Sequence, residues 1–456
     1  MPQPLILILA VGLTKKLLPY APRLNALAEK GWTRELRETV PAVTCSAQAT
    51  ILTGLQPQQH GVVGNGWLYR DTREVRFWQQ SNSLIQAEPL YETARKAAEQ
   101  RGQTFTAAKL FWQFNQGSSC EFSVTPKPYY GADGSKAFGI TGTPIGLAER
   151  LEKELGPFPF SAYWGPMAGL PSSTWIARAA ADLVGLNHDL TLVYLPHLDY
   201  DPQRFGPSAA DMPRRMSELD NACEPLLDAA KKSGSRVWIV SEYGLVDVNQ
   251  PVLINRILRQ AGFLRVRLGP FGDILDTFSS RAFAVVDHQV AHIYVNKSAD
   301  VPAVRELIAA HSGVDKVYAN EERADIGLNH PRAGELVALA QPNAWFAYPF
   351  WLDDRCMPDY ARTIDIHRKP GYDPCELFFD PILIWPKGRA AWRLLQKQLG
   401  FRALFDIIPT DPTLVRGSHG LPTIDNRPIL IGDGTVPGED LALSDVRDLV
   451  LQKLMP

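Results

Sequence analysis

The feature that most constrains the fold is the alternation of short apolar segments with segments of helical period. The run LILILA at 5–10 is typical of a fully buried strand, and PRLNALAEK at 22–30 has the apolar spacing of a helix that Gly31 would close. Such alternation predicts an α/β fold, with a central, mostly parallel sheet sandwiched by helices. The same patterns predict further helices at 90–100, 173–186, 209–232, 251–261 and 441–454, and further strands at 104–110, 190–195 and 236–240.

Two stretches interrupt this alternation. Residues 111–165 are rich in Gly, Pro, Ser and Tyr and have little periodicity, whereas residues 263–343 combine apparent strands with a helix at 301–310. Excursions of this length are often functional. We therefore expect both stretches to be an inserted α+β cap, leave 344–399 open between core and cap, and expect a catalytic core made of 1–110, 166–250 and 400–456.

The charge balance limits the partners that the chain can have. Its 456 residues include 47 Lys and Arg against 49 Asp and Glu, a formal charge of −2. Without a basic excess, we expect neither extended nucleic acid nor a membrane as a partner. The five cysteines contain no C-x-x-C pair, which is typical of free thiols in a reducing compartment. The apolar N-terminus is short and has no preceding Lys or Arg, which favours a strand over a signal peptide, so we expect a cytoplasmic protein.

Polar residues follow several of the predicted strands, where open α/β sheets bind their ligands. Asp199 and Glu242 each follow a buried strand, and His419 lies in the sequence R-G-S-H-G near the C-terminus. Thr44 stands where a helix closed by Gly54 begins, and the free N–H groups of a helix start favour an anion. Taken singly, Thr44 is better explained as an ordinary helix cap, and each of the other three is equally well explained as a hydrogen-bonded loop residue. Their common location indicates a site.

The sequence VPAVTCSAQATILTGLQPQQHGVVGN at 40–65 resembles the nucleophile segment of the alkaline phosphatase superfamily, in particular its type I phosphodiesterase/nucleotide pyrophosphatase branch, with phosphonoacetate hydrolase as a neighbour. The order of the three later polar segments agrees with that branch. The resemblance implies a two-zinc site in which a Thr oxygen attacks phosphorus. Carried over by position, Thr44 is the nucleophile, through a covalent phosphothreonine, and Asn65 holds a non-bridging phosphate oxygen.

The metal ligands depart from the pattern that the resemblance implies. The Asp of a D-G pair after the first strand is Val11 here, and the S-D-H-G motif contains Glu242 and Tyr243 in place of Asp and His. The His expected four residues after Asp199 is Gln203. A valine side chain cannot ligate a metal, and an amide or a phenol is a poor replacement for imidazole on zinc.

Three outcomes follow for the metal. In the first, one or two ions, Zn²⁺ or the harder Mg²⁺ or Mn²⁺, are held by Asp199, Glu242 and His419, with Gln203 and Tyr243 as weak ligands, and Glu242 serves as the base. In the second, other side chains replace the lost ligands. The candidates are His197, Asp287, His288, His292, Asp365, His367 and Asp373.

In the third outcome, the protein keeps the fold and an anion pocket without phosphoryl transfer. We expect a metal-dependent hydrolase of a phosphate or phosphonate ester or anhydride that acts on a small phosphorylated or phosphonate metabolite with Thr44 as nucleophile. The alternative is a catalytically silent member that binds such a metabolite. Further candidate ligand contacts are Lys369, Arg416 and the aromatic residues Trp112, Phe114, Tyr129 and Tyr130, whereas His60 and His292 are better explained by packing.

Overall fold

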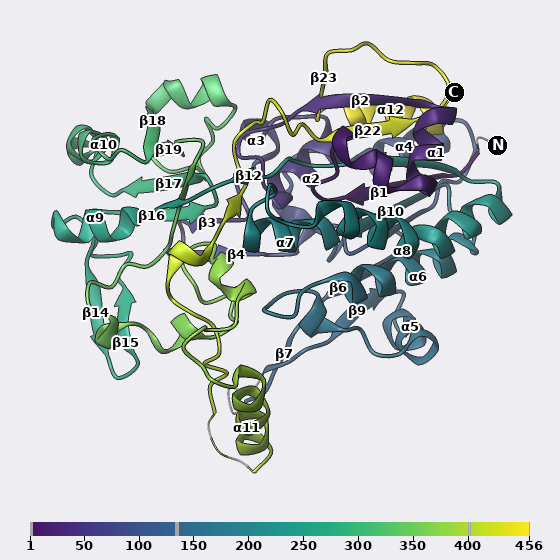
Figure 1. The fold of residues 1–456 in the computed structure, drawn as a ribbon. Helices are drawn as coiled ribbons and strands as arrows, with labels where there is room; N and C mark the ends of the chain where they lie inside the picture. Colours follow the sequence, from purple (N-terminus) through teal and green to yellow (C-terminus); the bar gives the residue numbers. More distant parts are fainter. Residues whose placement is uncertain (1–2, 133–135, 400, 402, 456) are drawn as a thin grey trace.

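A nine-stranded sheet forms the centre of the larger part of the molecule (Figure 1). The computed structural model describes residues 3–132, 136–399, 401 and 403–455. In the order in which they lie side by side, the strands of the large sheet are β23 (Leu441–Ala442), β2 (Trp32–Arg37), β22 (Ile429–Gly432), β11 (Arg236–Val240), β1 (Leu5–Ala10), β10 (Leu190–Leu195), β5 (Ala107–Leu110), β6 (Phe122–Pro126) and β9 (Ile140–Thr143).

The first strand of the chain lies at the centre of this sheet. All residues of β1 are buried, and β1 runs parallel to both β10 and β11, so that Leu7 pairs with Leu192 on one side and Trp238 on the other. β5 and β6 continue the parallel order. β22 runs antiparallel between β11 and β2, and β9 runs antiparallel to β6. The predicted α/β fold with a mostly parallel sheet is confirmed.

The helices fall into groups that pack against one another. α1, α6 and α8 form one group and α2, α4 and α12 form another. The bounds of the helices are α1 (Pro22–Lys30), α2 (Thr44–Thr53), α3 (Pro57–His60), α4 (Leu90–Gln100), α5 (Leu147–Leu155), α6 (Leu170–Val184), α7 (His197–Phe205), α8 (Met212–Ser233), α9 (Ile254–Gln260), α10 (Val301–Ala309), α11 (Pro386–Gln398) and α12 (Asp445–Leu454).

Most predicted elements are present, and several have shifted ends with a local cause. The helix predicted from 209 begins at Met212, because the Asp211 side chain accepts the Arg214 N–H and caps it. The helix predicted at 441–454 begins at Asp445, because the preceding segment pairs with β2 as β23. Five elements are confirmed with their predicted bounds: the strands at 5–10, 190–195 and 236–240 and the helices at 22–30 and 90–100.

A second, four-stranded antiparallel sheet lies within residues 263–343, on the left of Figure 1. In order, its strands are β16 (Ala282–Asp287), β17 (Val290–Val295), β19 (Leu336–Ala340) and β18 (Val314–Ala319). This sheet contributes to an apolar core of its own, shared with α9 and α10. The segment 111–165 differs from the expected cap, because β6 and β9 pair with the open edge of β5 and extend the large sheet.

Residues 344–399 lie between the part built on the nine-stranded sheet and the part built on the four-stranded sheet. β20 (Ala344–Phe346) pairs in parallel with β13 (Gln250–Val252), and α11 projects at the bottom of the view in Figure 1. Among the residues that the structure describes, no helix combines the length and the apolar character that crossing a membrane requires.

Candidate active site

A cavity of about 530 Å³ lies beyond the carboxyl ends of β5, β10 and β11. Its walls are mainly aromatic rings and amide side chains, and Lys127 and Asp199 are the only Lys, Arg, Asp or Glu among the described residues that line it. The polar residues that line it include Thr44, Asp199, Tyr243, His288, Tyr372 and His419. The crevice expected from the strand order is therefore present, and the polar segments after β10 and β11 meet there.

Thr44 is the first residue of α2. Val43 before it is extended, and the helix closes at Gly54, whose φ of 69° is the left-handed conformation that glycine adopts without strain. The Thr44 Oγ1 lies 3.2 Å from the Tyr243 hydroxyl oxygen. Both side chains line the cavity, so the hydroxyl of Thr44 is placed at a helix start beside space for a ligand.

Asp199 lies in the first turn of α7, with Gln203 one turn further along the same face. The Gln203 amide donates to the Asp199 Oδ2 over 2.7 Å, and the Tyr243 hydroxyl donates to its Oδ1 over 3.4 Å. Tyr372 in turn donates to the Gln203 Oε1 over 2.8 Å, which fixes the orientation of the amide. Burial raises the pKa of the Asp199 carboxyl to about 7, against its ordinary 3.8.

A hydrogen-bonded line therefore runs from Thr44 through Tyr243 to Asp199. An ionised carboxylate only accepts, so the Tyr243 proton points to Asp199 and the Tyr243 oxygen accepts from Thr44. Burial raises the pKa of the Tyr243 phenol well above its ordinary value, which keeps this proton in place at neutral pH. The arrangement offers the Thr44 proton a path to a carboxylate.

Glu242 is buried beside this line. Gln48 donates its amide to the Glu242 Oε2 over 3.2 Å, whereas the Oε1 has no hydrogen-bond partner among the described residues. Burial raises the pKa of this carboxyl well above its ordinary value, which favours the protonated form of Glu242. This protonation state suits a hydrogen-bond donor better than a general base.

Four aromatic rings stack at the cavity. The Tyr243 ring lies 3.7 Å from that of His419, His419 lies 3.6 Å from His288, and His288 lies 3.8 Å from Tyr372. The His419 Nδ1 donates to the Ala42 carbonyl over 2.8 Å, so its Nε2 is the nitrogen that faces the Asp199 Oδ1, at 3.9 Å. Burial lowers the pKa of His419 to about 3 and that of His288 well below its ordinary value, which leaves both imidazoles neutral.

Asn65 supports the start of α2 rather than lining the cavity. Its Oδ1 accepts the Cys45 N–H over 2.9 Å, while its backbone N–H and its Nδ2 donate to the two carboxylate oxygens of Asp287 over 2.7 and 3.1 Å. Burial raises the pKa of Asp287 to about 7. Asn65 and Asp287 thus join α2 to β16 and hold Thr44 in position.

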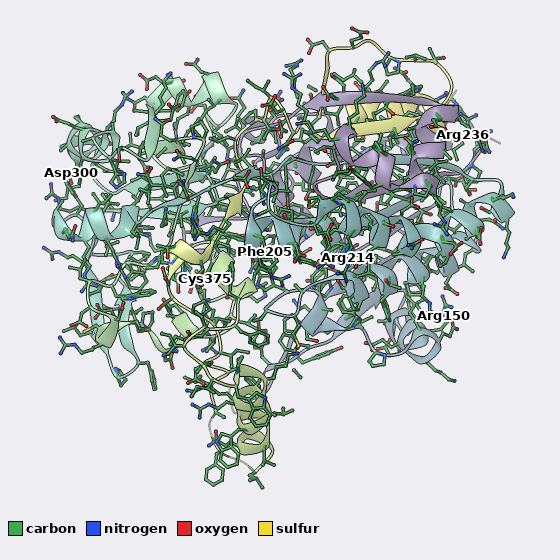
Figure 2. The ribbon with its side chains drawn as sticks, viewed as in Figure 1. Arg150, Phe205, Arg214, Arg236, Asp300 and Cys375 are labelled. Carbon is green, nitrogen blue, oxygen red and sulfur yellow. The ribbon has the colours of Figure 1, made fainter. Side chains whose placement is uncertain are left out.

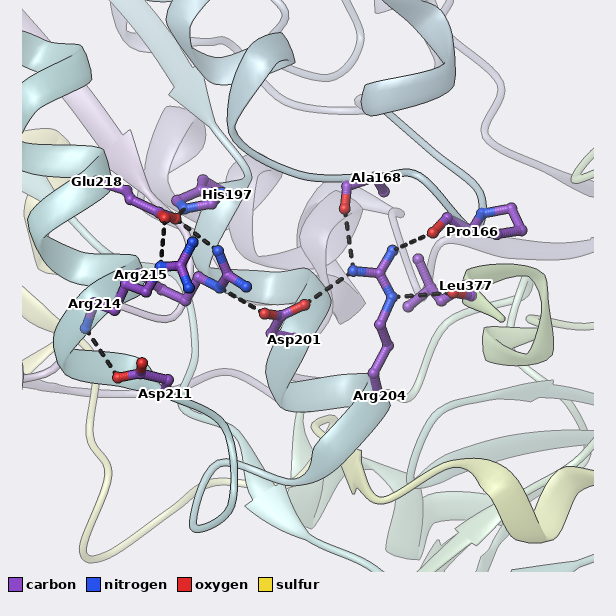
Figure 3. A network of polar contacts seen from close by, with 10 residues as sticks. All are labelled: Pro166, Ala168, His197, Asp201, Arg204, Asp211, Arg214, Arg215, Glu218 and Leu377. Atoms are coloured by element: carbon purple, nitrogen blue, oxygen red, sulfur yellow. Dashed lines mark hydrogen bonds and ion pairs between the residues drawn. The ribbon is translucent and has the colours of Figure 1, made fainter. Parts of the chain in front are cut away.

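Of the candidate replacement ligands, His197 faces away from this site. Its Nε2 lies 3.1 Å from Glu218, in a network with Asp201, Arg204 and Arg215 that links α7 to α8 (Figure 3). The Nε2 of His292 lies 2.9 Å from the Val63 carbonyl, a packing role. The remaining candidates fall in three places: His288 and His367 line the cavity, Asp287 holds Asn65, and Asp365 and Asp373 lie in the segment before Glu376.

The other candidate contacts lie away from the Thr44 hydroxyl. Lys369 is buried between Asp373 and Glu376, at 2.7 Å from each carboxylate, and Arg416 is exposed. His60, the last residue of α3, bonds to Thr50 of α2, a structural role as expected. Of the four aromatic candidates, Tyr130 lines the cavity, Trp112 and Phe114 are buried in the core, and Tyr129 is exposed.

The donor set does not fit the two-zinc site that the resemblance implies. Val11 is buried and apolar, and within the described part of the chain no three His, Cys, Asp or Glu side chains form a group that could hold a metal ion. The Asp199 carboxylate, which would have to ligate, accepts hydrogen bonds from Gln203 and Tyr243 on its two oxygens. Gln203 and Tyr243, at two of the positions where the resemblance implies ligands, are therefore donors to the carboxylate instead of ligands beside it.

The order of the sheet, with a threonine at a helix start beyond its strands, is that of an alkaline phosphatase-like α/β fold. The chain belongs to the type I phosphodiesterase/nucleotide pyrophosphatase family, whose family model matches residues 5–373. No curated protein matches the sequence significantly.

Solved structures of similar fold cover nearly the whole chain. Phosphonoacetate hydrolase from Sinorhizobium meliloti 1021, in complex with phosphonoacetate, is 15% identical with a TM-score of 0.63, over 99% of this chain and 96% of that one. The same hydrolase has also been solved with phosphonoformate. An inactive variant of murine ectonucleotide pyrophosphatase/phosphodiesterase 5, in complex with AMP, is 13% identical with a TM-score of 0.57, over 99% and 95%.

Sequence reasoning missed two parts of the site. Tyr372 orients Gln203 and closes the ring stack, and Gln48 bonds to Glu242. The only local signal for Tyr372 is its place in the P-G-Y-D turn. Gln48 lies one turn after Thr44 on the same helix, and that i,i+4 spacing could have marked it as a neighbour of the site.

Proposed function

We propose that the protein hydrolyses a phosphate or phosphonate ester or anhydride, with Thr44 as the nucleophile and a small phosphorylated or phosphonate metabolite as the substrate. The observation that carries this proposal is the line from Thr44 through Tyr243 to Asp199 at the cavity. Membership of the phosphodiesterase/pyrophosphatase family supports the same class of reaction. The ligands bound to the similar structures are phosphonates and a nucleotide, which supports the substrate class.

In the proposed first step, the Thr44 oxygen attacks phosphorus and its proton passes to the Tyr243 oxygen, while the Tyr243 proton passes to Asp199. The bond from phosphorus to the leaving oxygen breaks, and the leaving oxygen takes a proton from water. In the second step, water attacks the phosphothreonine and the bond from phosphorus to the Thr44 oxygen breaks. The Thr44 oxygen recovers its proton from Asp199 through Tyr243, and the proton that the attacking water loses neutralises the hydroxide left in solvent by the first step. The pKa of about 7 makes Asp199 a base matched to neutral pH.

The charges at the cavity limit the substrate. The start of α2 supplies a partial positive charge and Lys127 a full one, and Asp199 is negative when it acts as the base. This balance suits a singly charged diester or phosphonate ester better than a doubly charged monoester, whose second charge has no cationic partner among the described lining residues.

Metal activation is the route that the resemblance implies, and Asp199 and His419 are the residues that would hold an ion. Because Gln203 and Tyr243 donate to this carboxylate, we propose that the phenol and the carboxylate activate Thr44 in place of a divalent ion. Analysis of purified protein for Zn, Mg and Mn, with turnover measured before and after a strong chelator, tests this choice. Turnover that a chelator abolishes and one added ion restores would refute metal-free activation and leave the reaction class intact.

The decisive experiment for the reaction is Thr44→Ala, with bis(4-nitrophenyl) phosphate as the substrate. We expect turnover to be lost and, in wild-type protein quenched in acid, a phosphoryl adduct on the peptide that contains Thr44. Thr53→Ala is the matched control, because Thr53 lies on the same helix with its hydroxyl bonded to the Ala49 carbonyl. Full turnover in Thr44→Ala would show that another group attacks phosphorus.

The second candidate function is binding without chemistry. The observation in its favour is the stack of Tyr243, His419, His288 and Tyr372, which lines the polar end of the cavity with neutral rings packed on one another. Calorimetric binding of phosphate or AMP by protein that turns over no diester, with or without added divalent ions, would favour this alternative.

A further inference from the structure

A segment of the chain leaves the body of the molecule and returns to it. We call residues 381–399, 401 and 403–406 the finger. Its base is closed where the Asp380 N–H donates to the Ile407 carbonyl over 2.8 Å, and the Asp380 carboxylate pairs with Arg362. Helix α11 forms most of it and lies below every other labelled element in Figure 1, and the side chains of this segment stand clear of the rest in Figure 2.

The finger exposes large apolar side chains to water. Trp385 is 73% exposed and Trp392 is 56% exposed. Single exposed apolar residues are ordinary, but a contiguous group on a projecting element marks a surface that binds a partner. The large exposed apolar residues of the finger include Ile382, Ile384, Trp385, Trp392, Leu399 and Phe401.

These side chains have an order along the helix. Trp385, Trp392 and Leu399 are spaced by seven residues, which places them in one line along or just beyond the ends of α11. Gly388 allows the first of these rings to lie on the helix, because a Cβ at this position would stand 2.4 Å from ring atoms of Trp385. The sequence thus positions an indole ring at the start and another at the middle of an exposed line that ends in Leu399.

The charge of the finger differs from that of the whole chain. From 381 to 401 the sequence has basic residues at 387, 389, 393 and 397 and no Asp or Glu, although the complete chain has a formal charge of −2. Asp406 pairs with Arg389 and Arg393 where the chain returns to the body, and Lys387 is exposed. One carboxylate against four basic residues leaves the finger with a local excess of positive charge.

We propose that the finger docks the protein on the surface of a lipid bilayer that carries anionic headgroups. Indole rings and aliphatic side chains enter the interface between headgroups and acyl chains, and nearby Lys and Arg attract anionic lipids. A second copy of the chain is a poorer occupant, because pairing two fingers would bring positive charge against positive charge. The expectation of no membrane partner rested on the overall charge, which averages out this local excess.

The base of the finger lies near the wall of the cavity. Arg362, which pairs with Asp380 at the base of the finger, is two residues from Ile364 in the cavity wall. The docking proposal stands independently of the hydrolase proposal, since it uses none of the residues around Thr44.

The test uses the full chain and sedimentation with vesicles. We expect binding to vesicles of phosphatidylcholine mixed with phosphatidylglycerol, and binding at least about tenfold weaker to phosphatidylcholine alone or at high salt. The double variant Trp385→Ser/Trp392→Ser and the charge variant Lys387→Glu should each weaken binding. The matched control is Leu268→Ser/Phe278→Ser, which removes two apolar side chains that are also exposed but lie outside the finger.

Thermal unfolding of each variant, expected to be unchanged, shows that the fold is kept. Sedimentation velocity without lipid tests whether a second copy of the chain binds the finger instead of a membrane. A wild-type dimer that Trp385→Ser/Trp392→Ser converts to monomer would overturn the proposal in favour of a second copy. Absence of wild-type binding to the mixed vesicles, or equal binding by wild type and the double variant, would also overturn it.

Discussion

The rings of Tyr243 and His419 lie flat on each other, with 8° between their planes and 3.7 Å between their centroids. His419 is itself fixed by the bond from its Nδ1 to the Ala42 carbonyl. The stack therefore holds the Tyr243 hydroxyl between Thr44 and Asp199 before any substrate arrives. A preset hydroxyl is what proton transfer in a hydrolase requires.

Tyr243→Phe removes this hydroxyl and keeps the ring stack. We expect kcat for a diester to fall by about 10²- to 10⁴-fold, the usual contribution of positioned proton transfer, with little change in KM. Steady-state kinetics measure both. Tyr348→Phe is the control, because the Tyr348 hydroxyl is buried without a hydrogen-bond partner among the described residues, and it should leave kcat unchanged. A Tyr243→Phe enzyme with wild-type kcat would remove Tyr243 from the mechanism.

Activity should rise with pH through the titration of Asp199. The carboxylate form is the base, and burial raises its pKa to about 7, so kcat/KM should climb between about pH 5.5 and 8.5 with a midpoint near 7. His419, with a pKa lowered to about 3 by burial, stays neutral throughout this range. A pH profile of the hydrolysis rate checks this expectation. A flat profile would mean that no group with this pKa limits the reaction.

The raised pKa of Asp199 also makes stability depend on pH. Stability should fall as the pH rises, whereas activity should increase. Asp199 is raised from 3.8 to about 7 in the folded protein, so its contribution is fully present below about pH 4 and is lost as pH rises through 7. Relative to Asp199→Asn, which cannot ionise, the wild type should lose up to about 4 kcal/mol of unfolding free energy between pH 4 and 8. Urea unfolding at several pH values measures the difference. A constant difference between the two proteins would contradict the raised pKa.

Lys369 should be important for stability rather than for substrate binding. Its ammonium lies 2.7 Å from both Asp373 and Glu376, and Glu376 also accepts the indole N–H of Trp164 in the cavity wall. Lys369→Met leaves two buried carboxylates without their cation and should cost about 3–5 kcal/mol in urea unfolding. The exposed Lys316→Met should change stability by less than about 0.5 kcal/mol. Equal effects of the two substitutions would show that the buried pairs are dispensable.

The fold could be predicted where the sequence pattern is local. The six consecutive apolar residues of β1 can all be buried only in a strand that is covered on both faces. The helix from Thr44 to Gly54 has its start and stop signals at its two ends. Helix α7 has no such signal, because HLDYDPQRF is polar and contains Pro202. Without that helix, the one-turn spacing that lets Gln203 bond to Asp199 is not visible.

The site could be predicted only as a set of residues. Thr44, Asp199 and Tyr243 could be named from the resemblance, but no pattern along the chain predicts that a phenol would stand between a hydroxyl and a carboxylate. The ring stack combines residues 243, 288, 372 and 419, whose proximity depends on how the two sheets pack. The finger was missed for a related reason: its exposure depends on where its base leaves the body.

The place of β22 between β2 and β11 sets the order in which the protein can mature. During synthesis, β2 and β11 are made before β22, so the position between them stays open until residues 429–432 have left the ribosome. His419 arrives with the same late segment, so a nascent chain cannot hold a ligand at the cavity as the finished protein does. A chaperone that shields apolar strand edges would have to bind longest at this gap.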